Sequence, residues 1–112
     1  PGKRVRGRVR VMAQELFIFA RFHAREGHEG AIAAALSEVM IPTNQEPGCL
    51  GATSFRANAD GRAFFIHSRW RDEAAFEHHA TLAHTVKFLA AAESLVDQPF
   101  EIVRTHRIAG AA

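Results

Sequence analysis

Apolar positions alternate along the first part of the folded region. In residues 16–25 (LFIFARFHAR), one face of a predicted strand carries five apolar side chains, namely Leu16, Ile18, Ala20, Phe22 and Ala24. The opposite face begins with Phe17 and Phe19 and turns polar further along. Because both faces are apolar where the strand starts, we expect other parts of the protein to cover the sheet on each side.

A helical period replaces the alternation after Gly27. Between residues 28 and 40, apolar residues recur at intervals of three and four, as on the buried stripe of an amphipathic helix: Ile32, Ala35, Leu36, Val39 and Met40. Pro42 is predicted to end this helix, because its ring removes a backbone donor and clashes with the preceding turn. The turn Glu46-Pro47-Gly48 then leads into a second strand, residues 49–56.

The remaining elements complete a recognisable order. A hairpin loop at 58–61 precedes a third strand, 63–71, and Asp72 is a suitable N-cap for a helix that extends to about residue 96 with a break near Thr81-Leu82. Pro99 separates this helix from a last strand at 100–108. The order βαββαβ predicts an α+β domain of the ferredoxin-like class, with two helices on one face of an antiparallel four-stranded sheet.

The other face of this sheet is predicted to be apolar. Phe17, Phe19, Phe65 and Val103 occupy odd positions of their strands, opposite the helices. A soluble monomer rarely leaves such a patch in water. A second copy of the chain packed on this face would cover it, so we expect a homodimer through the sheet face, a dimeric α+β barrel. The alternative is that these residues merely lie at strand ends.

Length and charge refine the organisation. With 112 residues there is room for one domain, which we place at 15–110. Five of the 14 Lys and Arg residues lie before Met12, so the rest carries 9 basic against 12 acidic residues. We interpret residues 1–14 as a basic, disordered extension, with Met12 as a candidate natural start. A basic arm without aromatic residues is a weak nucleic-acid footprint, so we expect no nucleic-acid partner.

The hydropathy pattern and the cysteine content indicate the compartment. No apolar run approaches the 18 residues that a membrane-spanning helix needs, and we expect no membrane partner. The single Cys49 cannot form a disulfide within the chain, which agrees with a reducing compartment. Together these features predict a cytoplasmic protein.

Two groups of residues resemble a known family. The first is Glu46-Pro47-Gly48-Cys49-Leu50 after the first helix, and the second is Phe64-Phe65-Ile66 followed by Trp70, Ala75, His79 and His84. In this order they resemble the antibiotic-biosynthesis-monooxygenase family over residues 16–108. The resemblance implies a dimeric α+β barrel that oxygenates an aromatic or quinol-like small molecule with O₂ and without a cofactor. Family members often carry Glu where this chain has Ser68. The first strand also lacks the Asn on which the haem-degrading branch depends.

His79 is the central candidate for chemistry. On a continuous helix it shares a stripe with Ala75, Phe76, Leu82, Ala83 and Val86, which should face Ile66 and Trp70 on the sheet. An apolar cleft favours neutral imidazole, which can accept a proton as a general base. Trp70 would form the wall that orients a planar ring. The alternatives, a structural histidine and a core tryptophan, remain open.

These considerations define the predicted site. We expect His79, Trp70 and His84 to be catalytic, and Ile66, Phe76, Leu82 and Val86 to bind substrate. His84 lies about 140° around the helix from His79, so only a helix break between them could direct both at one cavity.

The sequence carries no motif for a bound ion or nucleotide. It has no HExxH motif, no pair of helical histidines four residues apart, no Cys/His cluster and no glycine-rich phosphate loop, so we expect neither a metal nor a cofactor. Cofactor-independent monooxygenation is the first functional hypothesis. A non-catalytic small-ligand-binding or stress-related protein of the same fold is the second, and a haem-degrading monooxygenase is a weaker third.

Overall fold

The computed structural model describes residues 14–111. The predicted basic extension therefore lies outside the described residues, apart from Gln14. Along the chain the elements are β1 (Leu16–His23), α2 (Glu29–Asn44), β2 (Cys49–Arg56), β3 (Ala63–Trp70), α3 (Glu73–Thr81), α4 (Ala83–Glu93) and β4 (Glu101–Thr105). This is the predicted βαββαβ order, with the second helix divided into two pieces. The last strand is shorter than the predicted 100–108.

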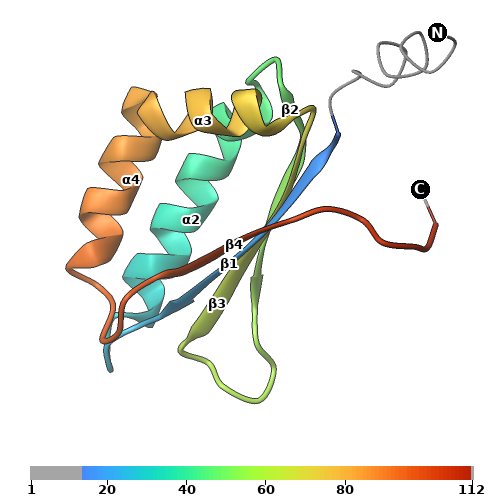
Figure 1. Cartoon of the computed structure of the whole chain (residues 1–112). Helices are drawn as coiled ribbons and strands as arrows, with labels where there is room; N and C mark the ends of the chain where they lie inside the picture. The colour runs from blue at the N-terminus through green and yellow to red at the C-terminus, as the bar shows by residue number, and fades with distance from the viewer. Residues whose placement is uncertain (1–13, 112) are drawn as a thin grey trace, which may run out of the picture.

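The four strands form one antiparallel sheet with the order β2-β3-β1-β4. The helices cover one face of this sheet (Figure 1). In the centre Ile18 lies opposite Ser68, and Ala20 lies opposite Ile66. The α+β, ferredoxin-like architecture is thus confirmed.

The core lies between the sheet and the helices. The inward positions of β1 are buried as predicted, with exposed fractions of 8% or less from Leu16 to Ala24. Ile32, Leu36 and Val39 of α2 pack against this face. Phe22 meets Phe88 of α4 edge-on, with ring centroids 5.6 Å apart. Alternation in the strand and the helical period of α2 therefore bury complementary faces of one core.

Helix α2 continues through Pro42 to Asn44, so the prediction that Pro42 ends it is wrong. The Asn44 side chain donates to the carbonyls of Met40 and Ala52 at 2.9 Å, and its Oδ1 accepts from the Ala52 amide at 2.9 Å. These bonds fasten the last helical turn to β2, and Thr43 is buried beside them. Tertiary contacts thus outweigh the lost backbone donor of Pro42.

The break between α3 and α4 confirms the prediction near Thr81-Leu82. The Asp72 carboxylate accepts a bond from the Ala75 amide at 2.8 Å and caps α3 as expected. Leu82 has extended backbone angles (φ −75°, ψ 149°), ends α3 and begins α4. The change of direction at Leu82 means that the two halves do not share one continuous helical face.

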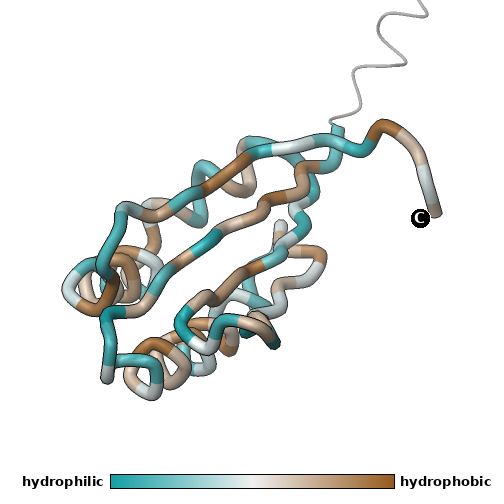
Figure 2. The backbone as a smooth tube through the Cα atoms, turned by 90° about the horizontal axis from the view of Figure 1, so that it is seen from below, coloured by the Kyte–Doolittle hydropathy of each residue, from teal (hydrophilic) through white to brown (hydrophobic). Residues whose placement is uncertain are grey.

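The outer face of the sheet carries large apolar side chains. Phe19, Phe55 and Val103 are each 51% exposed on the strands, opposite the helices. Figure 2 shows hydrophobic and hydrophilic positions alternating along the strands. Phe17 and Phe65 also lie on this face, as predicted, and are half-buried.

A charged cluster joins three segments at one end of β1. His23 Nδ1 lies 2.8 Å from Asp97 and its Nε2 lies 3.1 Å from Asp60, while Arg62 lies 3.4 Å from Asp97. The bonds to Asp97 and Asp60 raise the pKa of His23 above its ordinary 6.5, although burial lowers it. The Arg62 amide and His23 lower the pKa of Asp60, and His23 lowers that of Asp97.

This cluster predicts a pH-dependent stability. Protonated His23 stabilises the fold fully below pH 6.5, and that contribution is lost as the pH rises through the raised pKa. The carboxylates contribute above pH 3.8 and lose their contribution as the pH falls through their lowered pKa values. The cluster is therefore most stabilising between pH 3.8 and pH 6.5.

Urea unfolding measured at pH 5.5 and pH 8.5 should show that the protein is less stable at the higher pH, and His23→Gln should make this difference in stability smaller. Replacement of the exposed His106 by Gln is the control, and an equal reduction there would contradict the assignment.

Candidate active site

A cavity of about 390 Å³ lies between the sheet and the helices. Its walls are mainly apolar and aromatic, including Phe22, Ile66, Trp70, Phe76 and Phe88. Polar groups enter the lining at a few points, namely Thr43, Ser68, His79, Thr85 and Arg104. An apolar chamber with a few converging polar groups is typical of a small-molecule site.

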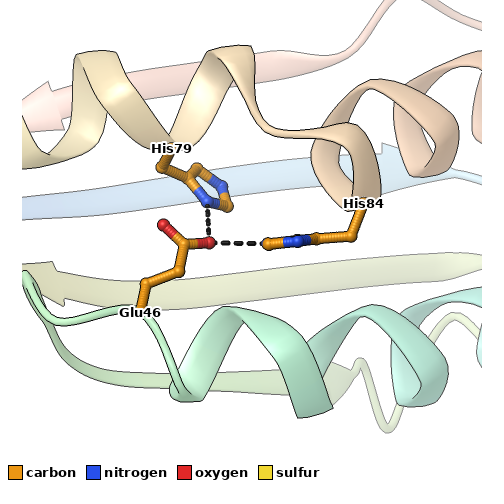
Figure 3. Close-up of side chains that lie close together, drawn as sticks. All are labelled: Glu46, His79 and His84. Carbon is orange, nitrogen blue, oxygen red and sulfur yellow. Dashed lines mark hydrogen bonds and ion pairs between the residues drawn. The ribbon is translucent and has the colours of Figure 1, made fainter.

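Glu46, His79 and His84 form a compact cluster (Figure 3), and His79 of this cluster lines the cavity. Glu46 Oε2 lies 2.7 Å from His79 Nδ1 and 2.6 Å from His84 Nε2. The Glu46 side chain is 7% exposed, against 14% for His79 and 25% for His84. The two imidazoles therefore share one nearly buried carboxylate oxygen.

The backbone positions these three side chains from three different elements. Glu46 lies in the turn after α2, and this turn packs closely on α3 at Gly48. A Cβ on Gly48 would lie 2.4 Å from the Cβ of Ala75, so this close approach requires glycine. His79 lies near the end of α3, and the break at Leu82 turns α4 so that His84 reaches the same carboxylate. The helix break that the sequence required is present, and it brings both histidines to one carboxylate, although His84 does not line the cavity.

The hydrogen bonds determine which nitrogen of His79 can act as a base. A carboxylate oxygen only accepts, so we assign the ring proton of neutral His79 to Nδ1, which donates to Glu46. The lone pair then resides on Nε2. Among residues 14–111, Nε2 has no hydrogen-bond partner, and it is not among the fully buried unpaired atoms. His79 lines the cavity, and Nε2 is its ring nitrogen without a partner in the described residues.

Trp70 packs directly against His79. The ring centroids are 4.6 Å apart with an interplanar angle of 39°, and the Phe76 ring lies 5.6 Å from Trp70 and 5.7 Å from His79. The indole N–H donates to Ser68 Oγ at 3.0 Å. Ser68 is buried and serves as the acceptor for Trp70. The bond fixes the indole plane that borders the cavity.

One buried polar atom has no partner in the described part of the chain. The hydroxyl oxygen of Thr43 is fully buried and makes no hydrogen bond, although Thr43 lines the cavity. An unpaired buried hydroxyl is costly unless something else bonds to it.

Only some of the other predicted site residues line the cavity. Ile66 and Phe76 line the cavity, whereas Leu82 and Val86 do not. Val86 is 55% exposed, so the expectation that it faces the sheet is wrong. The predicted stripe assumed one continuous helix, and the break at Leu82 changes the direction of the second half. His84 binds Glu46 and lines a small groove between α2 and α4 instead of the cavity.

Glu46 is the site residue that sequence reasoning missed. The residues Glu46-Pro47-Gly48 form the predicted turn. No feature of the neighbouring sequence, however, indicates that the Glu46 carboxylate is buried. The three side chains also offer metal-ligand atoms within 4.8 Å of one another. No local motif reveals this set, because Glu46 is 33 residues from His79.

No helix in the described residues is long and apolar enough to cross a membrane.

Comparisons with known proteins agree with this architecture. The family model described as "Antibiotic biosynthesis monooxygenase" matches residues 16–91. A protein named "Putative monooxygenase Rv0793", from Mycobacterium tuberculosis, is 26% identical over 91 residues, which are 81% of this chain and 89% of that protein.

Solved structures extend the comparison. The crystal structure of PA3566 from Pseudomonas aeruginosa matches with a TM-score of 0.81 and 30% identity, over 88% of this chain and 98% of that one. SnoaB from Streptomyces nogalater, a cofactor-independent oxygenase, matches with a TM-score of 0.78 over 88% of this chain and 97% of that one. At 16% identity, SnoaB shares the fold alone with this chain.

Proposed function

Because the chain belongs to the antibiotic biosynthesis monooxygenase family, we propose that it is a cofactor-independent monooxygenase acting on an aromatic, quinol-like small molecule. The observation that carries the proposal is His79, whose Nδ1 is held by Glu46 while Nε2 is available at an apolar cavity bordered by Trp70. This arrangement supplies a base and an aromatic wall in one place.

The chemistry begins with a proton transfer. A phenol or an activated CH group of the substrate gives its proton to His79 Nε2, and the negative charge of Glu46 stabilises the imidazolium that forms. The electron-rich anion passes one electron to O₂, and the two radicals combine to form a carbon–oxygen bond. The peroxide anion takes the proton back from the His79 imidazolium. The resulting hydroperoxide then loses water, so the carbon (a CH₂ group, or a ring CH of a phenol) becomes a carbonyl and the second oxygen atom leaves as H₂O. The substrate supplies all four electrons.

The protein contributes positioning and exclusion of water. Trp70 and Phe76 provide flat surfaces for an aromatic ring, and Ile66 extends the apolar wall. His84 acts through Glu46, because it holds the carboxylate oxygen that also binds His79. We assign His84 to positioning the base.

Oxygen uptake tests the function. The chain is incubated in chelator-treated buffer with a panel of quinols and anthrone-like compounds, and the expected result is O₂ consumption with one oxygen atom incorporated from ¹⁸O₂. The absence of uptake with every compound would contradict the proposal. Saturable quenching of Trp70 fluorescence by the same compounds, without uptake, would support a non-catalytic ligand-binding protein instead.

We further propose that two copies pair through the outer face of the sheet. Phe19, Phe55 and Val103 supply the exposed apolar surface that such an interface needs. A second sheet packed there would cover these side chains and complete the barrel implied by the resemblance.

A charge on this face is expected to separate the copies. Phe19→Asp would bury an unpaired carboxylate in the interface and weaken dimerisation by at least about 100-fold, roughly 3 kcal/mol. Sedimentation equilibrium should then change from twice the 12.3 kDa chain mass towards a single chain. Val86→Asp, on the exposed side of α4, should leave the dimer intact. A monomeric unmodified chain at micromolar concentration would contradict the interface.

A further inference from the structure

The two histidines of the cluster direct ring nitrogens at a single point. His79 Nδ1 from α3 and His84 Nε2 from α4 both lie within 2.7 Å of the same Glu46 oxygen. The three donor atoms come from three segments and all lie within 4.8 Å of one another. Two imidazole nitrogens and a carboxylate oxygen form the ligand set that Zn²⁺ accepts when three protein ligands leave one position open.

Local rearrangement of the three side chains would let them hold an ion. Tetrahedral Zn²⁺ with bonds of about 2.0–2.1 Å places its ligand atoms about 3.3 Å apart. The Glu46 oxygen must therefore move back from the two nitrogens, which are now 2.7 Å and 2.6 Å away, and the two nitrogens, which lie within 4.8 Å of each other, must reach the same separation of about 3.3 Å. The Glu46 carboxylate lies at the end of a flexible side chain, and its second oxygen, Oε1, makes no hydrogen bond to another described residue.

The site is also reachable from solvent. The His84 side chain is 25% exposed and lines the groove between α2 and α4. Glu38 and Lys87 line this groove and carry opposite charges, so together they neither strongly attract nor strongly repel a cation. The Glu46 carboxylate provides one negative charge towards the cation. A water molecule from the groove can fill the open position.

We propose that Glu46, His79 and His84 bind a divalent cation of the zinc class, and that its binding moves the ring proton of His79 from Nδ1 to Nε2. A neutral imidazole carries one proton, so coordination through Nδ1 places that proton on Nε2. Nε2 then has no lone pair to offer the cavity. The cation therefore prevents His79 from acting as a base. This last consequence rests on the proposed function, whereas cation binding and the proton shift do not.

Calorimetry with chelator-treated full-length chain tests the binding. Titration with Zn²⁺ should give one ion per chain with a micromolar or lower Kd, and Co²⁺ should give the visible bands of four-coordinate cobalt. His84→Gln should weaken binding by at least about 10-fold, in the range typical of disturbed metal sites. His78→Gln, which changes an exposed histidine of α3 next to His79, should bind Zn²⁺ as the parent does. No heat and no Co²⁺ bands, or equal binding by His84→Gln, would overturn the site.

Long-range ¹H–¹⁵N NMR of His79 tests the proton shift without any substrate. The proton should be on Nδ1 in the ion-free chain and on Nε2 after addition of Zn²⁺. A proton that stays on Nδ1 would overturn the switch. If a substrate is oxygenated, Zn²⁺ should inhibit over its binding range and a chelator should restore the activity. Binding and proton shift without any oxygenase activity would leave the cation site standing and reject only the proposed function.

Discussion

Replacement of His79 by alanine is expected to lower kcat for oxygen uptake by about 10²- to 10⁴-fold, the usual contribution of a positioned general base. His79 lines the cavity, and because Nδ1 is held by Glu46 at 2.7 Å, Nε2 is the nitrogen that we propose accepts the proton. Removal of the ring leaves the apolar chamber without its proton acceptor. Oxygen-electrode assays at saturating substrate measure the loss. Added imidazole should restore part of the rate if a missing base is the cause.

Two further variants separate a catalytic from a structural role for His79. Glu46→Gln keeps a side chain of the same shape but removes the charge that stabilises the imidazolium, so it should lower kcat by a smaller factor than His79→Ala. The exposed His78→Ala should leave kcat unchanged. Undiminished turnover by folded His79→Ala would remove His79 from the mechanism.

Replacement of Trp70 by alanine is expected to destabilise the fold by about 3–5 kcal/mol, the usual cost of removing a large buried aromatic side chain. Trp70 is 1% exposed and belongs to a small core with Leu16, Ile18 and Ala75. Its loss leaves a void and leaves Ser68 without the indole donor. Urea unfolding followed by circular dichroism at a fixed chain concentration measures the effect.

A conservative variant shows which part of Trp70 matters. Trp70→Phe retains an aromatic ring but loses the N–H bond to Ser68, so its destabilisation should be well below that of Trp70→Ala. Trp70→Phe combined with Ser68→Ala should recover part of the loss, because the buried hydroxyl no longer lacks its donor. Equal destabilisation by Trp70→Phe and Trp70→Ala would show that the hydrogen bond, and not the packing, dominates.

Local patterns predicted much of the fold. The alternation from Leu16 to Ala24 correctly identified the buried face of β1, because adjacent side chains of a strand point to opposite faces. Asp72 was correctly identified as the cap of α3, since its bond to the Ala75 amide spans only three residues. Such features depend on neighbours along the chain.

Predictions failed where distant contacts outweighed local preference. Pro42 does not end α2, because Asn44 fastens the last turn to Ala52 of β2. Val86 is exposed, because the extended backbone at Leu82 redirects α4. A continuous helical period could not reveal the size of that turn.

By itself, the sequence determined the order of the elements, the buried face of the central strand and His79 with Trp70 as neighbours at a candidate site. Only the tertiary structure decided that Glu46 joins His79 and His84, and that the hydroxyl of Thr43 is buried without a partner among the described residues. The physical reason is the distance along the sequence over which each kind of interaction acts. Side-chain periodicity and capping act over a few residues, whereas the burial of a carboxylate depends on segments that the chain brings together only when it folds.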